Sequence, residues 1–341
     1  MSTSLHPSDR LADSQRKIRA PFELDPTLCI YSPQANLDAL EHPRVKAWLE
    51  FLERRWQPPQ KGSRRIALII PCTKYKPYNT SREHRAINGA LLRAGWEPEG
   101  KTTTPPELLA VLDAGESPEL LHTGALVKDG VALDRIVMSE PLAMVPYTHI
   151  YKWKGEQSPA TSYDDPGLFE ARGTSVSPER ADCSAVDLGN GKWRWGPNER
   201  AAFAEMHNRL VDVIAATLRR VGGRYEAIGA WVSPGLTHRS FLADATLRKA
   251  EGLPASKRGP DGPVALRGAL DQIPGAVTVM PTQKQLDQAK TALAKRLARE
   301  GRQNTPNAVQ GIYARGDGND TPLGLHEALT HLTRWLNRMA K

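Results

Sequence analysis

The sequence predicts an α/β protein: a three-layer sandwich around a mostly parallel sheet, with a helical C-terminal extension. Three short runs carry this prediction, residues 66–70, 133–138 and 227–232, the second being apolar mainly in its second half. Short apolar runs are typical of strands buried on both faces, as in parallel sheets. Helical patterns lie between these runs, and strands that alternate with helices indicate a layered α/β fold.

The helices are predicted from apolar residues that recur every three or four positions. The expected ranges are about 43–56, 81–95, 198–221, 283–300 and 325–339. Ser81 suits the start of the second helix, because its hydroxyl can accept a hydrogen bond from an unpaired backbone N–H of the first turn. The fourth helix carries several lysines and arginines around a leucine stripe, so we expect a basic surface near the C-terminus.

Three regions are expected along the chain. Residues 1–60 form an N-terminal arm and helix, and residues 1–35, with four prolines and no periodicity, are predicted to be extended. Residues 61–248 form the α/β core. Residues 249–341 begin with a linker rich in glycine and proline over 249–274 and continue as the basic helical region.

The composition limits the class of partner. The chain has 341 residues and a net charge of +8. A basic chain favours a nucleic-acid partner, because neutralising phosphates releases counterions, although the charge also serves solubility. The three cysteines form no CxxC pair, and no apolar run reaches the roughly 20 residues of a bilayer span. We therefore expect a cytoplasmic protein with no membrane partner.

The segment directly after the first predicted strand, residues 71–84, is the most informative part of the sequence. It offers a thiol, two lysines, two phenols, hydroxyls and an imidazole at a strand-to-helix turn, where α/β enzymes place their chemistry. The helix beginning near Ser81 directs its positive end at this loop, which favours a thiolate or an anionic substrate group. The alternative is an inert buried cysteine beside solvated lysines.

The spacing in this loop resembles the core motif of the archaeosine synthase family, which elaborates 7-cyano-7-deazaguanine in archaeal tRNA. The family pattern is Pro-Cys, three residues, Lys-Pro-Tyr, two residues, Ser, two residues, His. The matching positions here are Pro71, Cys72, Lys76, Pro77, Tyr78, Ser81 and His84. A weaker similarity includes residues 139–146, with Glu140 as an extra residue, and the resemblance covers about residues 62–242.

The resemblance is to the catalytic core alone. The chain has no room for the family's transglycosylase barrel, which needs about 250 residues, and no segment resembles its RNA-binding PUA module. Stand-alone relatives of the core resemble components of phage and bacterial pathways that place 7-deazaguanines in DNA. The resemblance therefore implies a transferase that acts on the nitrile of a 7-deazaguanine base in DNA or tRNA, with a small amine as a possible second substrate.

The resemblance also implies roles for the loop residues. The thiolate of Cys72 is expected to add to the nitrile carbon, with Lys74 and Lys76 stabilising the anion. His84 is expected to protonate the nitrile nitrogen. In an alternative assignment Lys76 is the essential group and Cys72 is structural; the motif does not choose between them.

The other matched positions are expected to shape the loop and hold the base. Tyr78 and Ser81 are expected to orient the base as part of the catalytic set, and Pro71 and Pro77 to stiffen the loop beside it. Outside the motif, Asp187 is a candidate acceptor for a guanine-type edge, or else the cap of a turn. Trp193 belongs to a long loop, 147–197, whose aromatics either stack on bases or pack on the core.

The remaining histidines are isolated, so the sequence predicts no metal site and no cofactor. Residues 233–239, which include His238, follow the third strand and are a candidate for completing the pocket. Two further function classes remain as alternatives. One is a base-flipping or glycosylase-like nucleic-acid enzyme, and the other is a non-catalytic nucleic-acid-binding module, since fold analogy alone does not decide function.

Overall fold

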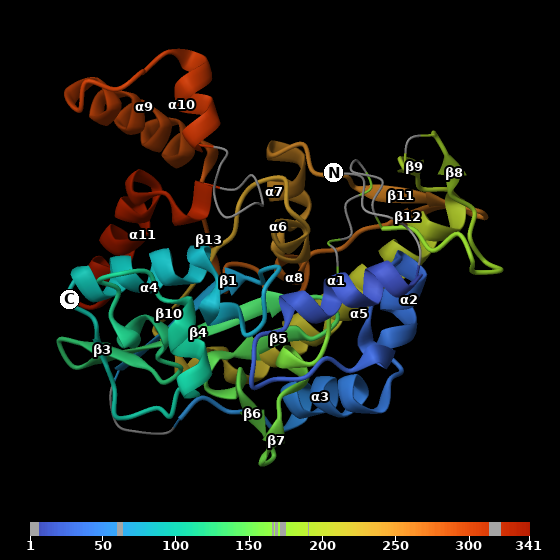
Figure 1. The fold of residues 1–341 in the computed structure, drawn as a ribbon, viewed down its shortest axis with the longest axis horizontal. Coiled ribbons are helices and arrows are strands. Elements are labelled where there is room, and N and C mark those ends of the chain that lie inside the picture. The colour runs from blue at the N-terminus through green and yellow to red at the C-terminus, as the bar shows by residue number, and fades with distance from the viewer. Residues whose placement is uncertain are drawn as a thin grey trace.

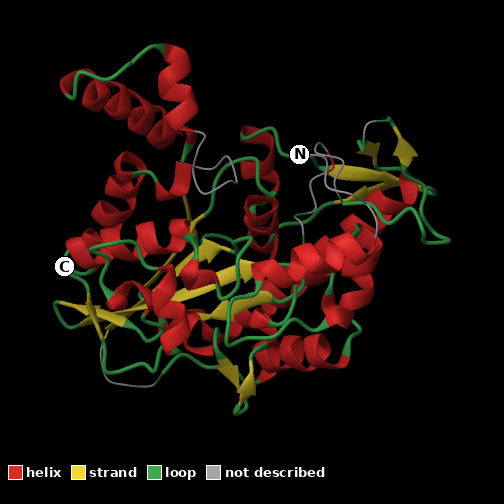
Figure 2. Cartoon of the chain, viewed as in Figure 1, coloured by secondary structure: helices red, strands yellow, loops and turns green. Residues whose placement is uncertain are grey.

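The centre of the protein is a twisted, mostly parallel β-sheet (Figures 1 and 2). The computed structural model describes residues 7–59, 64–165, 167, 170, 175–189, 191–313 and 322–341. Among these residues the sheet has seven strands. Six lie in the order β13 (Thr278–Met280), β10 (Ala227–Trp231), β1 (Arg64–Pro71), β4 (Val131–Ser139), β3 (Leu126–Lys128) and β2 (Glu97–Pro98).

The four strands β13, β10, β1 and β4 are parallel neighbours. Strand β4 pairs along one edge with β1, from Arg64 opposite Val131 to Pro71 opposite Met138. Its other edge pairs with β3 and with β5 (Ala143–Pro146), both antiparallel. Strands β1 and β4 are buried almost throughout, which explains their nearly continuous apolar sequence.

Helices cover both faces of the sheet. Helices α4 (Arg82–Arg93) and α11 (His326–Met339) pack together on one side. Helices α3 (Pro43–Arg54) and α8 (Ala269–Gln272) pack with the long helix α5 (Pro197–Val221) on the other. The predicted three-layer α/β class is confirmed, because the sheet lies between these two groups of helices and the apolar residues of both groups are buried.

The remaining helices and hairpins surround these layers. They are α1 (Pro7–Lys17), α2 (Pro33–Ala39), α6 (Thr237–Leu242), α7 (Ala245–Ala250), α9 (Gln283–Arg299), α10 (Pro306–Tyr313), and the strand pairs β6 (Lys152–Trp153) with β7 (Glu156–Gln157), β8 (Val186–Asp187) with β9 (Trp193–Arg194), and β11 (Ser256–Gly259) with β12 (Gly262–Ala265). In the part of the chain that the structure describes, no helix is both long and apolar enough to cross a bilayer.

Two segments differ from the sequence-based prediction. Residues 7–17, predicted to be extended, form α1, whose last residue Lys17 makes an ion pair with the buried Asp164. Residues 249–274, predicted to be a linker, contain the β11–β12 hairpin and α8. Asn208 of α5 fastens this segment, since its amide donates to Ala265 O (2.8 Å) and accepts from Arg267 N (3.0 Å). In both segments the secondary structure is stabilised by polar contacts to distant residues, which local periodicity in the sequence does not reveal.

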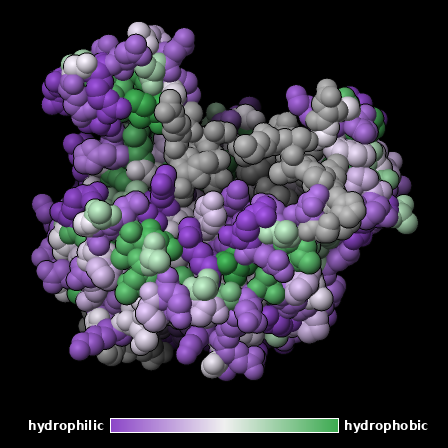
Figure 3. Space-filling view, viewed as in Figure 1, coloured by the Kyte–Doolittle hydropathy of each residue, from purple (hydrophilic) through white to green (hydrophobic). Residues whose placement is uncertain are grey.

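The C-terminal extension has a small core of its own. Leu293 and Leu297 of α9 pack with Val309 of α10 as a second apolar cluster. These two helices project from the body of the protein in Figure 1, and their outer side is mainly hydrophilic in Figure 3. The exposed cations include Lys284 and Arg299, so the predicted basic helix is present.

Gly229 is expected to be essential for the packing of α11 on the sheet. A Cβ atom there would lie 2.6 Å from the Trp335 ring and 3.1 Å from the Met280 methyl group. Gly229→Ala should therefore lower the free energy of unfolding by about 1–3 kcal/mol, measured by urea denaturation. Gly223→Ala is the control, because nothing lies within 4 Å of its Cβ position. Equal midpoints for the two variants would contradict this packing.

Candidate active site

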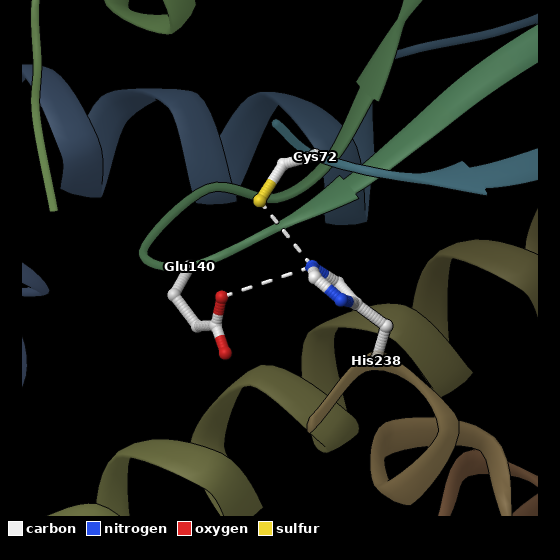
Figure 4. Close-up of side chains that lie close together, drawn as sticks. All are labelled: Cys72, Glu140 and His238. Carbon is white, nitrogen blue, oxygen red and sulfur yellow. Dashed lines mark hydrogen bonds and ion pairs between the residues drawn. The ribbon is translucent and has the colours of Figure 1, made fainter. Parts of the chain in front are cut away.

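Three chemically active side chains meet where three adjacent strands end. Cys72 directly follows β1, Glu140 directly follows β4, and His238 lies at the start of α6, after β10 (Figure 4). The helices that follow β1 and β10 leave toward opposite faces of the sheet, since α4 packs with α11 and α6 packs with α5. Such a switch point opens a crevice at the carboxyl ends of the strands, where α/β proteins bind ligands.

The three side chains are within interaction distance. The Cys72 Sγ atom lies 3.3 Å from His238 Nε2, and a Glu140 carboxylate oxygen lies 3.9 Å from the same nitrogen. The side chains of His238 and Glu140 are 11% and 7% exposed, and Cys72 is partly exposed. Among the described residues His238 Nδ1 has no hydrogen-bond partner. The cluster is therefore almost enclosed, and Cys72 is its most exposed residue.

Burial governs the protonation of this cluster. Burial raises the pKa of the Cys72 thiol well above its usual range; the charges of Asp165 and Glu140 raise it further, whereas Lys76 opposes them. Burial, followed by the charge of Asp165, raises the pKa of Glu140 to about 8. Burial lowers the pKa of His238 to about 4. The three groups are mainly uncharged at neutral pH, so a nucleophilic thiolate requires an additional positive charge nearby.

Lys76 lies in a buried charge network beside the cluster. Its side chain is 1% exposed, and its ammonium group lies 3.8 Å from Asp164 and 4.4 Å from the centre of the Tyr163 ring. The other oxygen of Asp164 accepts from Lys17 (2.6 Å) and Ser14 (2.8 Å). The backbone of Lys76 also pairs with the N-terminal arm, donating to Lys17 O and accepting from Arg19 N. The arm therefore holds Lys76 in place.

Tyr78 lies in a second buried network. Its hydroxyl group donates to Ser139 Oγ (3.1 Å) and shares a hydrogen bond with the Tyr163 hydroxyl group (2.8 Å). Ser139 and Tyr163 are also hydrogen-bonded to each other. Burial raises the pKa of Tyr78 well above its usual range, so its hydroxyl stays protonated. This network connects the motif loop to the end of β4, next to Glu140.

Ser81 and His84 hold the start of α4. The Ser81 hydroxyl accepts from the His84 backbone N–H (3.1 Å), as expected for the N-cap. The His84 ring is fully buried; Nδ1 lies 2.8 Å from the Tyr147 hydroxyl group and Nε2 lies 2.9 Å from Pro71 O. Because both ring nitrogens are engaged, the proton transfer predicted for His84 would require one of these bonds to break.

The other predicted residues occupy different places. Pro71 is the last residue of β1, and Pro77 precedes the short helical turn Tyr78–Thr80. Lys74 is exposed at the surface of the loop. Asp187 and Trp193 belong to the β8–β9 hairpin, which lies away from the strand ends in Figure 1. Asp187 is exposed and its carboxylate accepts from Gly189 N, which matches the turn-cap alternative, and Trp193 packs against the core.

The sequence predicts that residues 233–239 help to complete the pocket, but it singles out neither His238 nor Glu140 as a partner of Cys72. Glu140 looked like an extra residue within a known pattern, and His238 looked like an isolated histidine. The available signal was positional: each follows a predicted strand by a few residues, and parallel strands end at one edge. The order of the strands, which decides that β1 lies between β10 and β4, is a tertiary property that spacing does not report.

Comparison with known proteins does not extend this description. No family model matches the sequence, and neither curated proteins nor solved structures give a significant match.

The position of His84 predicts a loss of stability in acid. Burial lowers the pKa of His84 to about 4, whereas an unfolded histidine titrates near pH ~6.5. Between these values the unfolded chain binds a proton that the folded chain excludes, so stability falls as the pH falls. The contribution of His84 is about 3 kcal/mol. Urea denaturation at pH 7 and pH 4.5 measures it.

A matched pair of variants isolates this effect. His84→Gln should show a shallower fall in unfolding free energy between the two pH values than the unmodified chain. His326→Gln, at an exposed histidine on α11, should keep the original fall. Identical pH dependence in His84→Gln and the unmodified chain would contradict a buried neutral ring at position 84.

Proposed function

We propose that this protein modifies the nitrile of a 7-cyano-7-deazaguanine base in nucleic acid, DNA or tRNA, by nucleophilic addition that leads to an amidine. The observation that carries the proposal is the convergence of Cys72, His238 and Glu140 at the carboxyl ends of three adjacent strands, with Cys72 in a loop that has the archaeosine synthase spacing. A thiol, an imidazole and a protonated carboxyl group together suit proton-coupled addition to an electrophilic carbon.

Two versions of the addition account for every atom and proton. In the covalent version the Cys72 sulfur bonds to the nitrile carbon, and the thiol proton passes through His238 to the nitrile nitrogen, giving a thioimidate. An amine then displaces the sulfur, which recovers its proton, and the product is an amidine. In the direct version the amine itself bonds to the nitrile carbon and one of its protons moves to the nitrile nitrogen, while Cys72 has a supporting role.

The surroundings supply positioning and charge. Lys76 is fixed by Asp164 and provides positive charge beside the thiol without being exposed to compete as a nucleophile. The hydrogen bonds among Tyr78, Ser139 and Tyr163 fix the buried side of the motif loop against the end of β4. The basic extension formed by α9 and α10 offers exposed cations to a phosphate backbone, which is consistent with a base held in a polymer.

Nucleoside mass spectrometry tests the function directly. DNA and tRNA should be isolated from cells that carry a 7-deazaguanine pathway, with and without this gene, and digested to nucleosides. We expect the cyano nucleoside to accumulate, and its amidine product to disappear, in one of the two polymers when the gene is removed. The polymer affected identifies the substrate. Unchanged nucleosides in both polymers would exclude the proposed function.

Variants of the cluster should separate chemistry from folding. Cys72→Ala is expected to lower turnover of the cyano nucleoside by at least about 100-fold, and His238→Gln by about 10²–10⁴-fold, the usual range for a lost proton-transfer group. Cys183→Ala is the control, because Cys183 lies near α5 and outside the cluster. Thermal unfolding should be followed for all three. Full turnover by Cys72→Ala would remove the cluster from the mechanism.

A further inference from the structure

We propose that Cys72, Glu140 and His238 together bind one divalent cation of the zinc class and leave a fourth position open. The binding itself is independent of the reaction, whereas the role of the cation in the site rests on the proposed function. Among the described residues, this set offers a sulfur, an oxygen and a nitrogen that lie within 4.8 Å of one another. These are the donor types that Zn²⁺ takes in proteins.

The direction of the side chains distinguishes a metal site from a proton relay. In a relay the nucleophile and the carboxylate contact opposite nitrogens of the imidazole, so that one orients the ring and the other exchanges the proton. Here the Cys72 sulfur and the Glu140 carboxylate both approach Nε2 of His238, and among the described residues Nδ1 has no partner (Figure 4). One nitrogen cannot exchange a proton with both groups, but three donors around a common point suit a cation.

Two of the three distances between the ligand atoms are close to those of a tetrahedral centre. Zinc–ligand bonds of about 2.0–2.3 Å place neighbouring ligand atoms about 3.4–3.6 Å apart. The two distances measured to Nε2 are 3.3 Å for the sulfur and 3.9 Å for the carboxylate oxygen. The third pair, the sulfur and the carboxylate oxygen, lies within 4.8 Å, and rotation about the staggered torsions of the glutamate side chain is the movement that brings its oxygen closer.

The charges around the cluster also favour a cation. Asp165 is close enough to act on Cys72 through its negative charge, and Glu140 lies in the cluster itself. Lys76 provides positive charge near these carboxylates, but its ammonium group also interacts with Asp164, which forms a second ion pair with Lys17. A divalent cation would stabilise a bound thiolate and the Glu140 carboxylate together, because metal ligands bind in their deprotonated forms.

Three protein ligands with an open position are typical of catalytic rather than structural zinc sites. In the proposed reaction such a cation polarises the nitrile nitrogen as a Lewis acid. Cys72 then serves as a ligand, which favours direct addition: the amine nitrogen bonds to the nitrile carbon, one carbon–nitrogen π bond breaks, and an amine proton moves to the nitrile nitrogen. A metal-bound Cys72 thus excludes the covalent version of the addition.

Metal binding by the full chain tests the proposal. After dialysis against chelator, the chain should bind about one Zn²⁺, measured by titration with the metal alone and by elemental analysis. Cobalt(II) should give a thiolate-to-metal charge-transfer band in the near ultraviolet. Cys72→Ser should lose this band, whereas Cys29→Ser and Cys183→Ser, which alter the other two thiols, should keep it.

Removal of a ligand should weaken zinc binding by more than the 10–100-fold that outer-shell changes cost. We expect this for His238→Ala and Glu140→Gln, with circular dichroism confirming that each variant is folded. Substoichiometric zinc in the unmodified chain, cobalt spectra in Cys72→Ser identical to those of the unmodified chain, or a covalent adduct between Cys72 and the nitrile substrate would each overturn the proposal.

The outcomes separate the metal site from the function. If the metal-free chain converts the cyano nucleoside at the full rate, the catalytic role of the cation is excluded and the function stands; the binding itself is decided by the zinc and cobalt titrations. If the chain binds zinc through these ligands but nucleosides are unchanged in cells with and without the gene, the metal site stands and the function fails.

Discussion

The constraint on which this site depends is the parallel pairing of β10, β1 and β4. Parallel neighbours must end at the same edge, so residues from distant parts of the chain meet there without any local signal in the sequence. Cys72, Glu140 and His238 are separated by up to 166 positions along the chain, yet the sulfur and the imidazole are in contact. Each residue is close to the end of a buried strand, which leaves the backbone little freedom to move it away.

The buried charges beside the site show how the N-terminal arm becomes part of the loop. Asp164 is fully buried and faces two lysines, Lys17 from the arm and Lys76 from the motif. Removing one partner of a buried ion pair generally costs about 3–5 kcal/mol, because the remaining charge is left without compensation. The ion pair between Lys17 and Asp164 therefore connects the arm to the motif loop, and its loss would be costly. Lys17, 59 positions before Lys76, also accepts a backbone hydrogen bond from Lys76 and so helps to fix its position.

Sequence periodicity predicted the main strands and helices because burial dictates both. Strands β1, β4 and β10 and helices α3, α4, α5, α9 and α11 all lie where the apolar pattern placed them. The apolar pattern did not predict α1 or the β11–β12 hairpin, because polar contacts to distant residues stabilise both segments. The motif loop located Cys72, and residues 233–239 were a candidate for completing the pocket, but the contacts of Glu140 and His238 with Cys72 follow only from the strand order. Asp187 and Trp193 were predicted as base-binding residues from their residue types alone. Residue type does not show where in the fold a side chain lies, and both belong to the β8–β9 hairpin.

The motif itself consists largely of packing residues. Lys76, Pro77, Tyr78, Ser81 and His84 are all buried, and each contributes to a hydrogen-bonded, ion-paired or turn structure within the loop. Cys72 alone among the polar motif residues is partly exposed. A strict spacing is what such packing requires, because moving any of these side chains by one position would leave a buried polar group unpaired. The spacing therefore specifies how the loop is held, and the other two side chains of the candidate site follow the neighbouring strands, Glu140 after β4 and His238 after β10.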